Sequence, residues 1–388
     1  MENRQILALS RYGMIVAGIW RLPFTSRAAV RKFYALYSAF VHVFFAAFVA
    51  SMLIRFLILV AEKSSAELLF GSFAYLISFY ITAIKAVLCQ SSEFKRILSY
   101  IVEEERRMAM SNNQELFRCH LVQIRFAERI NLGIFSITVG LSVSAVMANA
   151  MQRANVEEYN RSYNASLEKH FVYELYYAKV NTEDHERLLA ILHAFTTAWI
   201  LFVGSSTQCI FITCIVFASS VFKTLQIKLR MLSTEDALKN LRSLVVEHQN
   251  AILFGVKLNS SVKYLMLMDF LFSSLNIGLV LILLLRAENT TQFTTSFYAC
   301  RLITIIFAIG WCSNEVQIQS LGLSDAIYES PWYEQTEDVK KILLMMIVRV
   351  RKPVALTIGP FDEMTLQSSL RIMKAAYSYC GIMAKKYN

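Results

Sequence analysis

Long apolar runs are the feature that most constrains how this chain folds. A helix that crosses a hydrocarbon layer about 30 Å thick needs roughly 20 mostly apolar residues. Backbone groups inside lipid must find partners within the spanning segment, so such runs fold as helices. Six runs of this kind lie at 33–60, 68–89, 130–151, 188–222, 264–285 and 294–315, and a weaker seventh lies at 364–383. The sequence therefore predicts an all-α membrane protein with seven transmembrane helices.

The distribution of Lys and Arg predicts the orientation. The first thirty residues show no pattern of a cleavable signal peptide, so we expect an N-terminus that stays attached and cytosolic. Under that topology 25 of the 39 Lys and Arg residues fall in inward segments and 9 in outward ones. Positive residues favour the cytosolic side of a membrane. The sequence predicts an N-terminus inside and a C-terminus outside.

Several chemistries find no support in the sequence. The net charge of +10 is dispersed between the apolar runs and forms no compact basic patch of the kind that binds nucleic acid. The seven Cys residues do not indicate a disulfide framework, because none lies in the longest outward loop. The six His residues lack a metal-ligand spacing, and we find no phosphate loop or nucleophile elbow. We expect no enzyme activity, no metal and no cofactor.

Some charged residues need a specific environment. The run 103–107 is interpreted as a solvated helix face, and we expect Arg55 and Lys85 to extend toward the lipid headgroups from the ends of their spans. Asp269 and Arg301 lie deeper, where a charge must face protein or water.

Two segments predict a cytosolic block. The apolar pattern of the fourth span continues toward residue 232, which exceeds the length that a bilayer needs. The run Ile342 to Val348 is too short to span and is followed by Pro353, so we predict a cytosolic helix from Asp338 to Arg351.

Glycosylation sequons give a second indication of topology. Asn160 and Asn164 begin sequons in the loop between the third and fourth spans, and Asn289 begins one between the fifth and sixth. All three lie outside under the predicted topology, whereas the sequon at Asn259 lies inside. Asn160 and Asn164 are our candidates for modification.

The last span carries a polar stripe. At 100° per residue, one narrow face collects Gln367, Arg371, Lys374, Ser378, Ile382 and Lys385, and the other face collects Leu366, Ile372, Met373, Ala376, Tyr377, Cys380 and Met383. Charged residues within a membrane are tolerated beside water, so the stripe predicts a pore lining built by several subunits. Ile382, as its bulky apolar member, is the gate candidate. An amphipathic helix lying on the membrane surface is the alternative interpretation.

Two C-terminal motifs resemble those of insect odorant receptors. "KPVALTIGPFDEMTLQSSLRIMKAAYSY", from Lys352 to Tyr379, is similar to a basic-Pro-x-x-Leu-x-x-Gly-x-Phe stretch followed by a helix ending in Tyr-Ser-Tyr. "WCSNEVQIQSLGLSDAIYESPWYE", from Trp311 to Glu334, resembles the Cys-x-x-Asn, Ala-x-Tyr and Trp pattern of that family. Ser313 and Ile358 depart from it, which implies a local change in packing.

The resemblance implies a ligand-gated cation channel in a heterotetramer with the odorant co-receptor, without a G protein. It implies a multi-pass protein of the plasma membrane of sensory neuron dendrites, with membrane lipid and a small volatile odorant as its other partners. The implied regions are a cytosolic segment 1–32, a ligand-binding bundle 33–315, a subunit anchor 316–358 that contains Tyr328 and Trp332, and a pore helix 359–388. Counting from Tyr379 as in the co-receptor also arrives at Ile382.

The resemblance further implies a pocket in the outer half of the bundle, among the second, third, fourth and sixth spans. The aromatic side chains there suggest a small, aromatic ligand. The candidate ligand-binding residues are Tyr75, Phe79, Tyr80, Phe135, Met147, Trp199, Phe202 and Tyr298.

Three alternatives remain beside the odorant receptor. A gustatory receptor shares the seven-helix plan, but the tail "YSYCGIMAKKYN" lacks the pattern of that family. A metabotropic receptor requires an outside N-terminus, and a transporter shows repeated halves that we do not find. Because Arg371, Lys374 and Lys385 repeated four times would repel cations, we predict that the chain alone conducts poorly.

Overall fold

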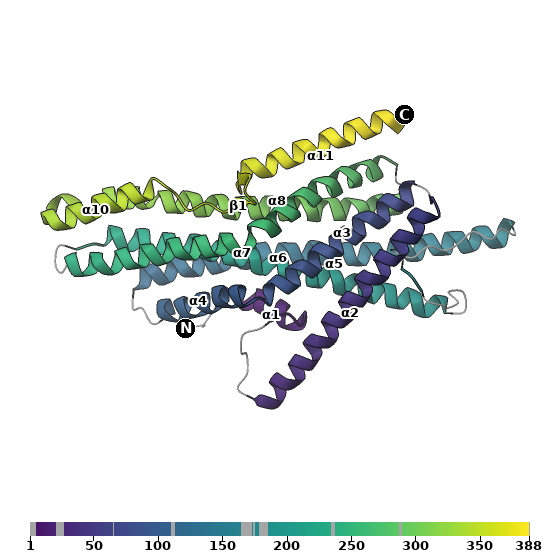
Figure 1. Cartoon of the computed structure of the whole chain (residues 1–388), viewed down its shortest axis with the longest axis horizontal. Coiled ribbons are helices and arrows are strands. Elements are labelled where there is room, and N and C mark those ends of the chain that lie inside the picture. The colour runs from purple at the N-terminus through teal and green to yellow at the C-terminus, as the bar shows by residue number, and fades with distance from the viewer. Residues whose placement is uncertain are drawn as a thin grey trace.

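A computed structural model describes residues 5–20, 27–64, 66–109, 113–163, 173, 175–177, 185–233, 237–286 and 289–387. The described chain is an elongated bundle of helices (Figure 1). Its elements are α1 (Ala8–Val16), α2 (Ala28–Ala61), α3 (Ala66–Cys89), α4 (Ser92–Ala109), α5 (Gln114–Tyr163), α6 (Glu186–Arg230), α7 (Ala237–Arg286), α8 (Asn289–Leu321), α9 (Leu323–Glu329), η1 (Trp332–Glu334), α10 (Glu337–Val350), β1 (Thr357–Ile358), β2 (Asp362–Glu363) and α11 (Leu366–Tyr387).

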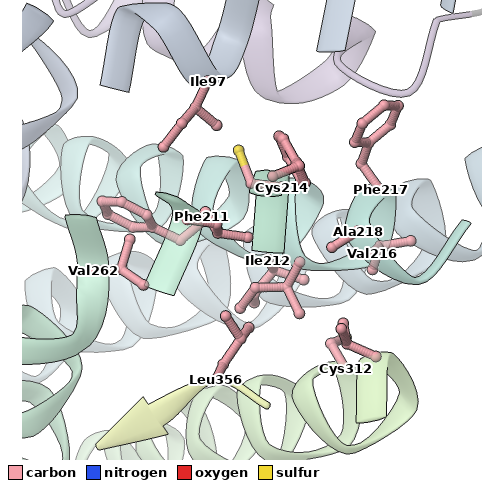
Figure 2. Packing of buried hydrophobic residues seen from close by; sticks show 14 of the residues in the cluster. Ile97, Phe211, Ile212, Cys214, Val216, Phe217, Ala218, Val262, Cys312 and Leu356 are labelled. Atoms are coloured by element: carbon pink, nitrogen blue, oxygen red, sulfur yellow. The ribbon is translucent and has the colours of Figure 1, made fainter. Parts of the chain in front are cut away.

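Helix α6 forms the core of the bundle. In its most apolar stretch 89% of the residues are buried, against 22% in α2. Figure 2 shows Phe211, Ile212 and Phe217 of α6 among side chains of α4, α7 and α8 and beside Leu356. Small and hydroxylated residues on α6 permit this close approach, and Ser205 Oγ lies 2.7 Å from Thr138 Oγ of α5. Helices α1, α3, α4, α5, α7, α8 and α9 pack directly on α6.

The N-terminal segment is part of this core. Ile6, Leu7 and Met14 are almost fully buried, and α1 packs on α6 where Gly13 approaches Ser206. The backbone N–H of Ile6 donates to Glu105 Oε1 at 2.6 Å. Glu105 is consequently buried, so the expectation of a solvated face for residues 103–107 is wrong at this position. Glu103 and Glu104 do form the expected pairs, with Arg107 of the next turn.

Helices α5 and α7 are much longer than a bilayer requires. Each contains 50 residues, which corresponds to about 75 Å of helix. The predicted continuation of the fourth span is confirmed by α6, and the predicted helix at 338–351 is confirmed by α10. In Figure 1, α10 lies at one end of the bundle beside α7, far from the C-terminus of α11.

A short hairpin joins α10 to α11. Strands β1 and β2 pair antiparallel, and Gly359 between them adopts φ +58°, a left-handed conformation that glycine accepts easily. The N–H of Gly359 donates to Lys263 O of α7 at 2.9 Å, and the N–H of Thr357 donates to Asn259 Oδ1 at 2.8 Å. The side chain of Asn259 therefore anchors the hairpin to α7.

Six helices of the described part are long and apolar enough to cross a membrane. They are α2, α3, α5, α6, α7 and α8, and they contain the six stronger spans expected from the sequence. Helix α11 carries the polar stripe, and its crossing stays a prediction. Helix α5 continues to Tyr163, so Asn160 lies on a helix and not in the expected loop. Asn164 lies outside the described residues.

Candidate ligand site and polar cavity

Four aromatic rings meet between α2, α3 and the segment before α6. Phe48 of α2 and Phe79 of α3 lie 5.7 Å apart, and Tyr173 lies 5.3 Å from the first ring and 5.9 Å from the second. Tyr75, one turn before Phe79, stacks on it at 6.3 Å. We call Phe48, Tyr75, Phe79 and Tyr173 the aromatic cluster. Such edge-on and offset rings form an apolar wall with a few polar positions, as in many pockets for small molecules.

Tyr173 is the member of this cluster that sequence reasoning missed. It precedes α6 in the chain and inserts into the bundle, where its hydroxyl bonds to Thr196 Oγ1 and its ring lies 4.6 Å from the tilted ring of His193. Burial raises the pKa of Tyr173 to about 12, so the hydroxyl stays protonated at neutral pH. The aromatic run "FVYELYY", in a loop predicted to lie outside, was the available signal, since exposed loops seldom contain so many apolar rings.

Tyr298 of α8 connects the cluster to α7 through Ser78. Ser78 Oγ lies 2.9 Å from Ala74 O, 3.1 Å from Tyr298 Oη and 3.1 Å from Asn276 Nδ2. Because the single Ser78 hydroxyl proton goes to the Ala74 carbonyl, Tyr298 and Asn276 donate to Ser78 Oγ. The ordered chain from Tyr298 through Ser78 to Asn276 thus joins α8, α3 and α7.

The other predicted ligand residues divide into two sets. Phe135 of α5 lies 5.7 Å from Phe202 of α6, and Trp199 lies 6.1 Å from Phe202, which gives a second aromatic group on α5 and α6. Tyr80 and Met147 are 57% and 59% exposed on the outer sides of their helices. The structure therefore brings together Tyr75 and Phe79, links Tyr298 to them through α3, and places Tyr80 and Met147 apart.

Charged and polar side chains surround a cavity of about 70 Å³ between α3, α6, α7 and α8. Lys85 Nζ lies 2.6 Å from Asp269 Oδ2 and donates to Gln208 Oε1 at 2.6 Å. Arg301 lies on the same wall, and Ser78 and Asn276 also line it. We call this space the polar cavity. Lys85 is only 8% exposed, so the expectation that it extends toward the headgroups is wrong, because Asp269 and Gln208 give it partners in the interior.

The C-terminal helix exposes its polar stripe as expected. Gln367, Arg371, Lys374 and Ser378 are exposed, whereas Ala376 and Cys380 are buried against the bundle. Ser369 Oγ donates to Ile306 O of α8 at 3.1 Å, and Arg371 pairs with Asp362 of the hairpin. Tyr377 was expected on the packed face but is 75% exposed, because no helix in the described part of the chain covers that side. Helix α11 includes Ile382 and Lys385, whose side chains lie outside the described part.

The predicted anchor residues lie on an exposed apolar face. Tyr328 and Trp332 keep much of their surface accessible, and so do Tyr333, Leu344, Met345 and Val348. Large apolar side chains exposed on such short helices are typical of protein contacts. We call these six residues the anchor face.

Comparison with known proteins gives consistent relatives. "Odorant receptor 10" of Aedes albopictus is 34% identical over 37% of this chain and 39% of its own length. "Odorant receptor Or2" of Anopheles gambiae is 31% identical over 36% of this chain and 38% of its own length. The chain thus aligns with about two fifths of the length of these relatives.

The fold is that of a solved insect olfactory receptor. The OR5 receptor of Machilis hrabei in complex with eugenol superposes with a TM-score of 0.82 over 98% of this chain and 97% of its own, at 15% identity. The predicted all-α membrane fold is confirmed by that likeness, and the family is one of receptors and not of enzymes. The sequence pattern of the 7tm odorant receptor family matches residues 39–377, and the chain belongs to this family of multi-pass insect membrane proteins.

Proposed function

We propose that this odorant receptor is the ligand-tuning subunit of a non-selective cation channel. The observation that carries the proposal is the chain Tyr298–Ser78–Asn276, because it links the helices of the aromatic cluster to α7. Helix α7 in turn packs along α11, where Gly278 approaches Tyr379 and the carbonyl of Ala376. When a ligand displaces Tyr298, the movement is transmitted to the proposed pore helix through three contacts: Tyr298 with Ser78, Ser78 with Asn276, and α7 with α11.

The ligand is a small volatile molecule with a large apolar surface. The rings of Tyr75 and Phe79 offer it shape and hydrophobic contact, and the hydroxyl of Tyr298 offers an oxygen that can still accept a hydrogen bond. Phe135, Trp199 and Phe202 form the second aromatic group, which we propose as a further contact surface for the ligand. Eugenol, the ligand in the OR5 structure, has the same combination of an aromatic ring and polar oxygens.

Opening requires that the ligand bind the open arrangement more tightly than the closed one. We place the N-terminus inside and α11 across the membrane, with its polar stripe toward a central axis. Outward movement of α11 carries Ile382 away from that axis and wets the pore. The charges of Arg371 and Lys374 oppose cations, so co-receptor subunits supply most of the lining.

The heterotetramer assembles through the anchor face. Tyr328, Trp332 and Leu344 expose apolar surface. On the proposed cytosolic side lipid does not cover this surface, and a partner subunit supplies the contacts. The assembled channel works in the plasma membrane of sensory neuron dendrites without a G protein.

The test is whole-cell current from cells that express this chain with an odorant co-receptor during exposure to a panel of volatiles. We expect odorant-evoked cation current from the pair and none from either chain alone. Tyr298→Phe with the co-receptor retains surface expression but responds at higher odorant concentration, since the hydrogen bond to Ser78 is lost. A robust current from this chain alone, or an unchanged response of Tyr298→Phe, contradicts the proposal.

A further inference from the structure

The polar cavity contains more positive than negative charge. Lys85 and Arg301 contribute two cationic groups, while Asp269 is the single acidic residue on its described lining. Arginine stays protonated in proteins, and the side-chain amine of Lys85 lies 2.6 Å from the carboxylate of Asp269. The described walls of the cavity therefore carry an excess of one positive charge.

An excess charge at this depth requires compensation. Lys85 and Asp269 are both 8% exposed, and the helices around them cross the membrane. Removing one ion from water costs several kcal/mol unless an opposite charge or a full set of hydrogen bonds replaces the solvent. Asp269 lies 2.6 Å from Lys85 and also attracts Arg301, so one carboxylate is shared between two cations. Its Oδ2 atom has no hydrogen-bond partner among the described residues, although it touches Lys85.

Two donors at the cavity have no acceptor. The Nε2 group of Gln208, a residue that is 1% exposed, has no hydrogen-bond partner in the described structure, because its Oε1 atom accepts from Lys85. Arg301 Nε is likewise unpartnered among the described residues. The side-chain oxygens of Ser78 and Thr82 direct their protons to the carbonyls of Ala74 and Ser78, so these hydroxyls are not competing donors. The cavity thus combines positive charge with N–H groups that await an acceptor.

We propose that the polar cavity is a binding site for one small monovalent anion, held by Arg301 and Gln208 beside the Lys85–Asp269 pair. The free volume of about 70 Å³ accommodates a chloride ion with water, or a carboxylate group. The same chemistry has two sources, a free halide ion or the carboxylate of an organic ligand. This inference concerns the cavity alone and does not depend on the proposed channel function.

The first experiment measures binding of radioactive chloride to the full chain, purified in lipid nanodiscs, with gluconate as the inert counter-anion. We expect saturable binding of one chloride per chain that unlabelled bromide displaces. Competition by acetate distinguishes the sources: displacement at concentrations similar to bromide identifies a site that also takes carboxylates, and no displacement identifies a halide site. An absence of saturable binding of both labelled chloride and labelled acetate to the folded wild-type chain overturns the proposal.

Two variants give opposite expected results. Arg301→Gln removes a cation and weakens chloride binding about tenfold or more, whereas Asp269→Asn removes the competing anion and strengthens it about tenfold. A folding defect produces only losses, so the gain in Asp269→Asn keeps the test decisive if Arg301→Gln is unstable. Arg55→Gln is the matched control, because Arg55 pairs with Glu62 at 3.8 Å outside the cavity. Weaker binding by Asp269→Asn, or equal losses in Arg55→Gln and Arg301→Gln, contradicts the assignment.

Discussion

Helix α2 and helix α10 expose apolar side chains to a similar extent, yet in different surroundings. Leu57 of α2 is 58% exposed and Leu344 of α10 is 62% exposed. Helix α2 has 34 residues and the composition of a membrane span, so lipid tails can cover Leu57. Helix α10 has 14 residues, which is too short to cross a bilayer, and begins with two acidic residues, so we expect a protein partner and not hydrocarbon to cover Leu344. An exposed apolar side chain therefore does not by itself identify a protein interface. Whether lipid or water surrounds the helix must also be considered.

The largest expected effect concerns assembly through the anchor face. The double substitution Leu344→Ser and Met345→Ser removes two exposed apolar side chains from α10. We expect recovery of the odorant co-receptor in pull-downs to fall about tenfold or more, because buried anchors dominate interface energies. The matched control, Leu53→Ser and Leu57→Ser on α2, alters recovery by less than about twofold, since lipid and not protein covers those positions. Equal losses in both variants would erase the distinction between the two helices.

A smaller effect is expected where α8 meets α11, the contact between the core and the C-terminal helix. A Cβ atom at Gly310 would lie 2.9 Å from the backbone oxygen of Thr365 and closer still to Ser369 Oγ. Gly310→Val therefore separates the helices, with an expected destabilisation of about 1–3 kcal/mol from overpacking. Thermal unfolding of the purified chain measures this loss. Gly133→Val serves as the control, because nothing lies within 4 Å of a Cβ atom there, and an equal loss in the control would contradict the packing argument.

The hydrogen bond between α8 and α3 is expected to matter less for stability than for response. Tyr298→Phe keeps the ring but removes the group that donates to Ser78 Oγ at 3.1 Å. We expect a loss of about 1 kcal/mol in the free energy of unfolding, the usual net value of one hydrogen bond. Thermal unfolding checks the magnitude, with Tyr80→Phe on the exposed side of α3 as the comparison. A loss of stability as large as that of Gly310→Val would indicate that Tyr298 is a structural residue of the core.

The smallest effect is expected at an exposed ion pair. Arg96 Nη1 lies 3.0 Å from Glu93 Oε1 on α4, and both side chains are largely accessible. Arg96→Gln should change the unfolding free energy by less than about 0.5 kcal/mol, because water screens such pairs. A larger loss at this site would mean that α4 has neighbours beyond those of the described chain.

The positions of the transmembrane helices could be predicted from the sequence, but the contacts between the helices could not. Apolar runs located the six stronger spans, because the bilayer imposes both their length and their helical form. The helical wheel of the last span correctly predicted that Gln367, Arg371 and Lys374 are exposed. By contrast, α4 and the ends of α5 and α7 are amphipathic and polar, so hydropathy alone did not delimit them.

The polar partners depend on contacts between distant parts of the chain. Lys85 and Asp269 are 184 positions apart in sequence, and only the packing of α3 against α7 brings them together. Glu105 reaches the N–H of Ile6 in the same way. Tyr173 was missed because it belongs to a connection, whereas periodicity detects only residues within regular helices.

The hairpin between α10 and α11 is attached to α7 by the bonds that Lys263 O accepts from Gly359 and Asn259 Oδ1 accepts from Thr357. Helix α11 begins only a few residues later and runs for 22 residues, a rod about 33 Å long. The hairpin can therefore act as a fixed pivot, and α11 as a rigid lever that tilts about it. A tilt of about 5° at the pivot displaces the far end of such a rod by about 3 Å, the width of a water molecule. Rearrangements too small to disturb the packing near the hairpin thus become large at the end of the helix where Ile382 lies.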